Sequence, residues 1–100
     1  MTETVASVKE LRSKLEAWIA YREFGGVTFY TQAEWTAKGE TLCADAVLSA
    51  AIEDSPLQVI LNYAWPPDVE DIVQELTRLL ERLGYWYEIG HSWSLHFYPL

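Results

Sequence analysis

The chain has 100 residues, of which 50% are hydrophobic and 14% aromatic, and its formal net charge is −8. A domain of this size can fold without a metal, and a single cysteine, Cys43, excludes an internal disulfide and fits a reducing cytoplasm. Only seven Lys and Arg stand against fifteen Asp and Glu, which disfavours nucleic acid or an anionic membrane as the partner.

Residues 3–24 have the spacing of an amphipathic helix, with apolar side chains three and four positions apart and charges of both signs between them. The pair Gly25-Gly26 predicts where this helix ends. The first residues lack the basic and apolar regions of a signal peptide, and no apolar run approaches the ~18 residues of a membrane-spanning helix.

The next segment, Val27–Thr31, is rich in β-branched and aromatic residues and predicts a strand. Thr31 is followed three positions later by Glu34, the spacing of a helix capping box. We therefore expect a short helix that begins after Thr31, is anchored by Trp35 and ends at Gly39.

The segment Leu42–Asp54 fits two structures. Its alanines favour a helix, whereas its alternating pattern favours a strand. We favour the strand, which the turn Asp54-Ser55-Pro56 would join as a hairpin to a second strand, Leu57–Ala64. The apolar centre of Leu57–Ala64 predicts an interior strand that is covered on both faces.

A strongly amphipathic helix is predicted from Asp68, its N-cap, to Leu83, with Gly84 as the residue that ends it. Acidic residues are concentrated in its first turns and two arginines lie late, as the helix dipole prefers. Its buried stripe has the regular spacing of Val69, Ile72, Val73, Leu76, Leu79, Leu80 and Leu83.

The C-terminal residues predict a β-hairpin in which Tyr85–Ile89 pairs with Ser92–Tyr98 around the two-residue turn Gly90-His91. This register places Glu88 opposite Trp93. The face expected to pack on the helices then carries Trp86, Trp93, Leu95 and Phe97. The other face, which water or a partner could reach, carries Tyr85, Tyr87, Ile89, Ser94, His96 and Tyr98.

Together these elements predict one α+β domain over residues 1–100. Two main amphipathic helices would pack on one face of a mainly antiparallel sheet of about four to five strands, which ends in a C-terminal aromatic β-hairpin.

No pattern of catalytic, metal-binding or cofactor-binding residues emerges from the sequence. The two histidines, His91 and His96, are five positions apart in the hairpin and do not form a chelating pair. Cys43 is typical of a small buried residue, and no glycine-rich phosphate loop occurs. An enzyme would need His96 with a carboxylate such as Glu88 or Asp45 in one cleft.

Five tryptophans and six tyrosines are more than a small core easily hides, and both residue types anchor protein interfaces. We expect a small, acidic, non-catalytic, cytoplasmic protein-binding module, an adaptor or inhibitor that meets a basic protein surface or forms a homodimer. The expected contact residues are Trp65, Tyr85, Tyr87, His96 and Tyr98. The alternative is a domain that binds a small ligand in an aromatic-lined pocket.

Overall fold

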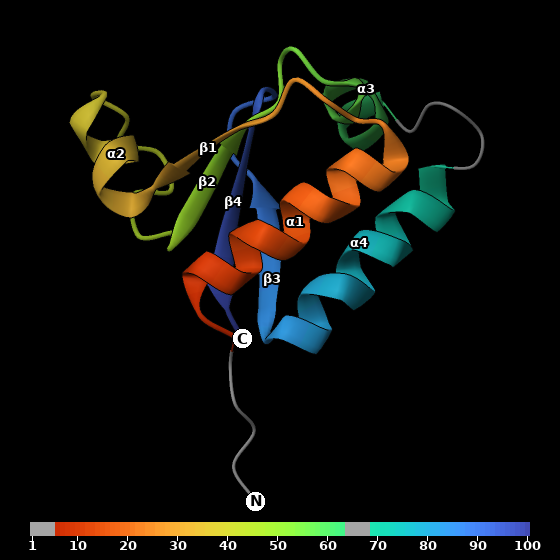
Figure 1. Ribbon diagram of the computed structural model, residues 1–100. Helices are drawn as coiled ribbons and strands as arrows, with labels where there is room; N and C mark the ends of the chain where they lie inside the picture. Colours follow the sequence, from red (N-terminus) through yellow and green to blue (C-terminus); the bar gives the residue numbers. More distant parts are fainter. Residues whose placement is uncertain (1–5, 64–68) are drawn as a thin grey trace, which may run out of the picture.

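The computed structural model describes residues 6–63 and 69–100 (Figure 1). In chain order its elements are α1 (Val8–Arg22), β1 (Thr28–Thr31), α2 (Gln32–Ala37), β2 (Leu48–Ala51), α3 (Pro56–Tyr63), α4 (Val69–Leu83), β3 (Tyr85–Ile89) and β4 (Ser94–Pro99). The four strands form one sheet of order β1-β2-β4-β3, in which every neighbouring pair is antiparallel. The expected α+β fold with its C-terminal hairpin is confirmed.

The hydrophobic core lies between α1, α3 and α4 on one side and the sheet on the other. The helices contribute Leu11, Leu15, Trp18, Leu57, Ile60, Ile72, Leu76 and Leu80, and the strands contribute Phe29, Leu48, Ala50, Tyr85, Leu95 and Phe97. Burying each large apolar side chain contributes about 1.5–3 kcal/mol. Within residues 6–63 and 69–100, no helix has the length and hydropathy needed to cross a membrane.

The first helix and the capping box largely follow the sequence. The α1 helix begins after Ser7, whose Oγ accepts from the Glu10 amide at 3.1 Å, and it ends two to three residues before the glycine pair. At α2, Thr31 Oγ1 accepts from the Glu34 amide at 3.1 Å, and the Glu34 carboxylate accepts from the Thr31 amide at 2.8 Å. The predicted capping box is therefore confirmed, whereas the proposed N-cap Asp68 lies outside the described residues.

The predicted strand Leu57–Ala64 is wrong, because Pro56–Tyr63 is the helix α3. The Ser55 hydroxyl accepts from the Leu57 amide at 3.2 Å, and proline suits a first helical position, where its missing N–H is not needed. Val59 is 43% exposed while Leu57 is buried, so the apolar run covers only one face. The Asp54-Ser55-Pro56 turn thus starts a helix and not a hairpin.

The favoured strand within Leu42–Asp54 is present, but only over Leu48–Ala51. These four residues are all buried, because β2 is a central strand with β1 on one side and β4 on the other. The preceding residues, 42–47, form an irregular turn in which Cys43 has a left-handed φ of 56°.

The predicted hairpin register is wrong by three residues. Glu88 lies opposite His96 and Trp86 opposite Tyr98, around a loop of four residues, 90–93. Gly90 has no positive φ, so the type II′ turn does not form. Instead, the Ser94 hydroxyl accepts from the His91 amide at 2.8 Å and stabilises the wider loop.

This shift turns β3 over relative to β4, because side chains alternate between the two faces of a sheet. Tyr85, Tyr87 and Ile89 therefore join Leu95 and Phe97 on the helix side. Trp86 lies with Tyr98 on the opposite side, whereas the predicted register places Trp86 on the helix side and Tyr98 on the other. The most exposed aromatic residue of the hairpin is thus one that the predicted register would have buried.

Two connections at one end of the sheet lie against each other. The Ser55 hydroxyl donates to the carbonyl of Phe24 at 2.8 Å, and Gly26 adopts a φ of 93° directly against Asp54. A Cβ atom on Gly26 would lie 2.0 Å from the Asp54 carbonyl oxygen. Only glycine fits this position without a backbone shift.

We predict that Gly26→Ala lowers the free energy of unfolding by about 1–3 kcal/mol, because it adds both backbone strain and a steric clash. Gly25→Ala is the matched control, since a Cβ atom there meets nothing within 4 Å, and its effect should stay within about 0.5 kcal/mol. Urea unfolding measures both. Equal stabilities for the two variants would contradict the close contact at Gly26.

Candidate functional site

The sheet has a second face, on the side away from α1, α3 and α4. The strand registers place Thr28, Tyr30, Ser49, Ala51, Trp86, Glu88, Ser94, His96 and Tyr98 on it. The α2 helix and its neighbouring loops cover part of this second face, and Trp35 is the side chain that they bury there. The part that they leave uncovered is the candidate site.

Under the covered part lies a closed polar network around His96, which is 0% exposed. Its Nδ1 lies 2.9 Å from Ser49 Oγ and its Nε2 lies 2.9 Å from Ser94 Oγ, while Trp35 packs edge-on against the ring with centroids 5.0 Å apart. A neutral imidazole offers one donor and one acceptor, and a hydroxyl can serve either role. His96 is therefore fully hydrogen-bonded and out of reach of a substrate.

The uncovered part of the second face begins at Trp86 and Tyr98, whose rings stack with centroids 4.8 Å apart and planes 24° apart. Trp86 is 42% exposed and Tyr98 is half-buried. Leu100, which lines one hollow together with Trp86, is 73% exposed. Leu42, 42% exposed, directly precedes Cys43, whose Sγ donates to Glu88 on this face. We call Trp86, Tyr98, Leu42 and Leu100 the aromatic end patch.

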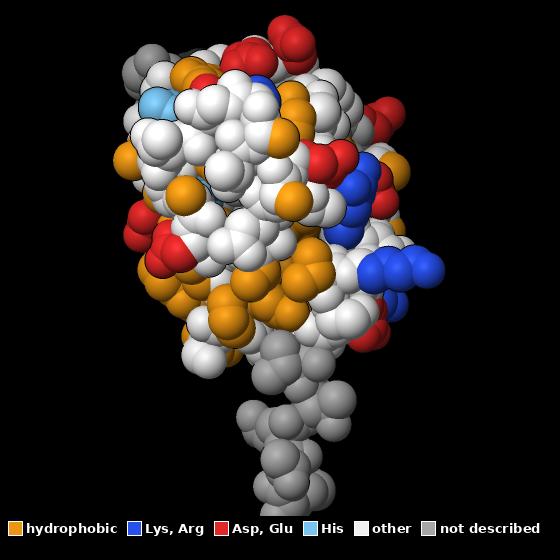
Figure 2. Space-filling model, turned by 90° about the vertical axis from the view of Figure 1, so that its left-hand side faces the viewer, with side chains coloured by type: hydrophobic (Ala, Val, Ile, Leu, Met, Phe, Trp, Pro, Cys, Tyr) orange, Lys and Arg blue, Asp and Glu red, His pale blue; other side chains and the backbone are white. Residues whose placement is uncertain are grey.

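A shallow hollow of about 150 Å³ adjoins this patch. Its lining consists of Thr77, Leu80, Glu81, Tyr85, Trp86, Tyr87 and Leu100, without a Lys or Arg. Figure 2 shows apolar side chains gathered at the end of the molecule where Figure 1 places the C terminus, with acidic side chains along the left edge of the patch. The surface thus combines contiguous apolar area with a recess that a partner side chain can enter.

The carboxylates of Glu88 and Glu81 lie beside the aromatic end patch. Glu88 accepts a hydrogen bond from Cys43 Sγ at 3.4 Å, and Glu81 lines the hollow beside Trp86. Burial raises the pKa of Tyr98, and the neighbouring groups Cys43, Glu88 and Asp45 raise this pKa further. The electrostatic environment of the patch is therefore negative, which favours a cationic contact.

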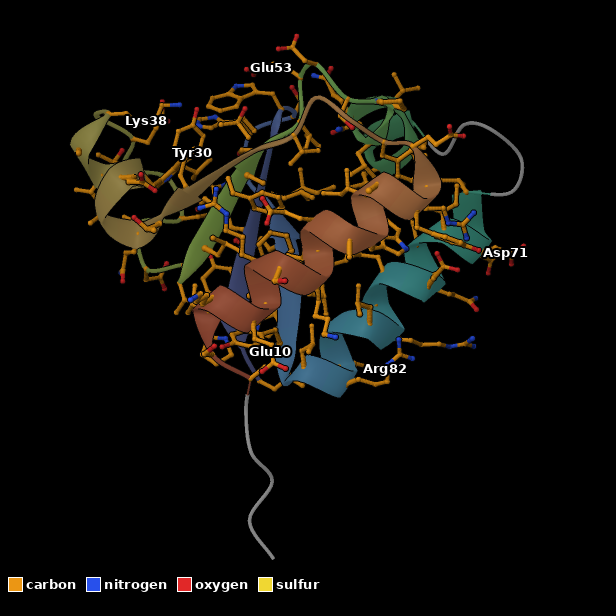
Figure 3. The ribbon with its side chains drawn as sticks, in the orientation of Figure 1. Glu10, Tyr30, Lys38, Glu53, Asp71 and Arg82 are labelled. Carbon is orange, nitrogen blue, oxygen red and sulfur yellow. The ribbon has the colours of Figure 1, made fainter. Side chains whose placement is uncertain are left out.

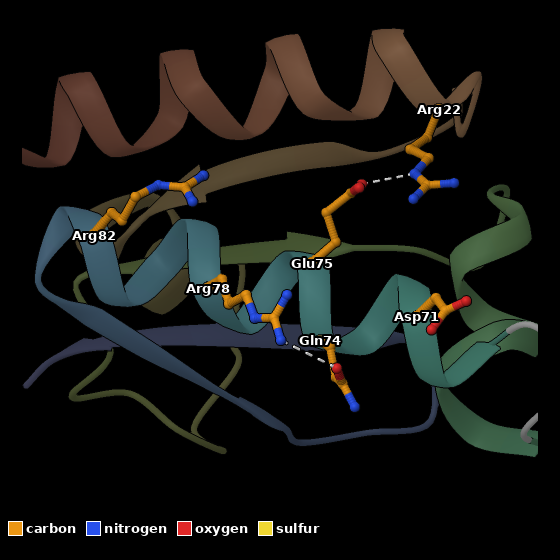
Figure 4. A pocket seen from close by; sticks show the side chains of 6 residues that line it. All are labelled: Arg22, Asp71, Gln74, Glu75, Arg78 and Arg82. Atoms are coloured by element: carbon orange, nitrogen blue, oxygen red, sulfur yellow. Dashed lines mark hydrogen bonds and ion pairs between the residues drawn. The ribbon is translucent and has the colours of Figure 1, made fainter.

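A second hollow, of about 450 Å³, lies along α4 beside the end of α1 (Figure 4) and is lined by Arg22, Asp71, Gln74, Glu75, Arg78 and Arg82. Glu75 accepts from Arg22 Nε at 2.7 Å and from Trp18 Nε1 at 2.6 Å, and these two bonds lower its pKa. Asp71 and Arg82 lie toward opposite ends of α4 in Figure 4. The main polar contact in this groove joins two helices, so we assign it to the fold.

The five residues expected at an interface fall in different environments. Tyr98 lies on the aromatic end patch, and Tyr87 is half-buried on the helix side of the sheet. Tyr85 is 4% exposed, and its hydroxyl donates to the Ala6 carbonyl at 2.5 Å. His96 is enclosed in the polar network with Ser49 and Ser94. Trp65 lies outside the described residues.

Trp86, Leu42 and Leu100 are the patch residues that sequence reasoning missed. The predicted two-residue turn, Gly90-His91, gives a register that places Trp86 on the helix side of the sheet. The signal that could have corrected this is Ser94, because a serine three residues after His91 can accept from the His91 amide and widen the loop. Nothing in the sequence marks the other two: Leu100 directly follows β4, and Leu42 lies far from the hairpin in sequence.

Comparison with protein-family models, with curated proteins and with solved structures finds no match for this chain. Among the residues that the structure describes, no group of three His, Cys, Asp or Glu side chains is arranged to hold a metal ion. The chemistry of the second face is therefore the basis on which a function is inferred.

The His96 network predicts a specific pH dependence of stability. Burial, and secondarily His91, lower the pKa of His96 in the folded state. The stabilising effect of the neutral ring is fully present above the unfolded-state pKa of about 6.5, and it is lost as the pH falls toward the lower folded-state pKa.

We expect the free energy of unfolding to decrease below about pH 6.5, and the slope to be smaller in His96→Gln. Urea unfolding between neutral and mildly acidic pH measures this slope. An NMR titration in which the His96 ring protonates at or above its ordinary pKa would contradict the proposed network.

Proposed function

We propose that the protein is a small, non-catalytic binding module whose aromatic end patch docks onto a basic protein surface. The observation that carries this proposal is the exposed Trp86–Tyr98 stack next to carboxylates. Tryptophan and tyrosine are enriched among the side chains that dominate binding energy at protein interfaces. Stacking restricts both rings before a partner arrives, so less conformational entropy is lost on binding.

Charge determines which partner fits. The chain carries a net charge of −8, and Glu81, Glu88 and Asp45 lie at the patch or beside it. A second copy would bring the same charges together, which opposes self-association through this patch. A basic protein with an apolar side chain for the hollow satisfies both features of the surface.

The alternative, a small ligand held between the sheet and the helices, gains little support from the geometry. The apolar cavity there measures about 10 Å³ and is lined by core residues such as Leu15, Phe29 and Leu76. Typical ligand sites occupy roughly 300–1,000 Å³. The hollow at Trp86 suits one side chain of a partner better than a whole metabolite.

Such a module would act as an adaptor or as an inhibitor that occupies the basic surface of its partner. The cytoplasm remains its expected location, because Cys43 is unpaired and partly accessible beside Glu88 and an oxidising compartment would expose this thiol to disulfide formation.

The test begins with capture of partners from the lysate of the source organism, using the wild type and the double variant Trp86→Ala/Tyr98→Ala as baits. Calorimetry with the purified partner then gives affinities. We expect Trp86→Ala to weaken binding about 30-fold or more, the effect of losing a central anchor worth about 2 kcal/mol. Glu88→Gln should slow association and reduce its salt dependence, because rim charges act mainly on the encounter.

Tyr21→Ala is the matched control, because Tyr21 is an aromatic residue on α1 that is 76% exposed. This variant should bind like the wild type. A double variant that melts normally and retains every partner would refute the assignment of the patch. Light scattering that finds a wild-type dimer, and a monomer for the double variant, would show a second copy as the occupant and contradict the basic partner.

A further inference from the structure

Three aromatic rings surround the ammonium group of Lys38 on the covered part of the second face. The Nζ atom lies 4.4 Å from the ring centroid of Tyr30, 5.2 Å from that of Trp35 and 5.4 Å from that of Trp93. The three rings come from β1, from α2 and from the loop before β4. Figure 3 shows Lys38 and Tyr30 side by side between α2 and β1.

The rings are held in place by contacts that do not involve Lys38. Trp35 is buried, its indole N–H donates to the Leu42 carbonyl at 2.8 Å, and its centroid lies 5.8 Å from those of both Tyr30 and Trp93. His91 stacks on Trp93 with centroids 4.7 Å apart and planes 6° apart. Glu40 in turn lies 3.1 Å from His91 Nε2. The group of Tyr30, Trp35 and Trp93, which we call the aromatic cage, is therefore preorganised.

Lys38 is positioned to leave this cage. It is the exposed C-cap residue of α2, and within residues 6–63 and 69–100 it forms no ion pair. In the described structure its ammonium group is therefore held by the three aromatic rings and not by a carboxylate in direct contact. A primary ammonium is also strongly hydrated, so that water competes effectively with the rings for it.

We propose that the aromatic cage binds the alkylated ammonium group of an external ligand, with Lys38 as a tethered occupant that the ligand displaces. A quaternary ammonium carries the same charge as lysine but is more weakly hydrated, so it loses less on entering the cage. Recognition of such groups by several converging rings is a general use of the cation–π interaction. The ligand chemistry could come from a free small molecule or from a methylated lysine of a protein.

This inference is independent of the aromatic end patch, because no residue is shared between the two groups. NMR of the tryptophan indole N–H groups provides the test, with the Trp93 signal assigned from Trp93→Phe. Titration with tetramethylammonium chloride or choline should shift the Trp35 and Trp93 signals. The neutral isostere of choline, 3,3-dimethylbutan-1-ol, should not shift them, because it has the shape without the charge.

Removing the tethered occupant should strengthen binding. If Lys38 fills the cage about nine-tenths of the time, Lys38→Ala should bind tetramethylammonium about tenfold more tightly than the wild type. Lys38→Gln is a second variant that keeps a polar residue at the helix end, and Lys14→Ala removes an exposed lysine of α1 as the charge-matched control. Titration with a trimethyllysine peptide and with the same peptide unmodified then distinguishes a methylated protein from a free small molecule as the ligand.

Equal shifts with choline and its neutral isostere would overturn the proposal. It would also fail if the folded Lys38→Ala and Lys38→Gln variants bound tetramethylammonium no more tightly than the Lys14→Ala control. Tight binding of choline without a preference for the trimethyllysine peptide over the unmodified one would assign the cage to a free ligand.

Discussion

The packing of Trp35 against His96 determines how much of the second face remains available. This single indole, carried by a six-residue helix, covers the central row of the sheet and encloses the serine–histidine network beneath it. A helix this short cannot also reach the far ends of β3 and β4. Trp86 is therefore left exposed and Tyr98 half-buried. The surface proposed for binding exists because little of the chain covers this face of the sheet.

Both candidate sites share one physical character. Each presents aromatic rings in a chain with a net charge of −8, and carboxylates lie close to each: Glu88 at the aromatic end patch and Glu40 behind Trp93 in the cage. Aromatic faces and carboxylates both attract cations, and neither attracts phosphate. The second face as a whole is therefore suited to cationic groups, whether on a protein surface or on a smaller ligand.

Much of the fold could be predicted because it depends on local signals. The capping box at Thr31, the stop at Gly84 and the stripe of α4 each follow from a few neighbouring residues. The errors arose where tertiary packing decides. An apolar run such as that of α3 fits a buried strand or a helix equally, and only Ser55 and the one-sided burial distinguish them.

The candidate site was harder to predict than the fold. Its exposed tryptophan depends on the hairpin register, and a shift of an odd number of residues exchanges the two faces of a strand. The aromatic cage joins residues from Tyr30 to Trp93, a contact that local sequence patterns do not encode. The sequence pointed to Tyr98 because it lies on the predicted amphipathic face of the hairpin, whereas the predicted register placed its stacking partner Trp86 on the other face.

Hydroxyl-radical footprinting, with and without the captured partner, would test the central claim most directly. In the free protein Trp86 and Tyr98 should be oxidised, while the buried Trp35 is spared. In the complex, labelling of Trp86 and Tyr98 should fall strongly while that of Tyr21 stays unchanged. Undiminished labelling of Trp86 in the complex, together with protection of Tyr21, would contradict the account and place the interface on α1.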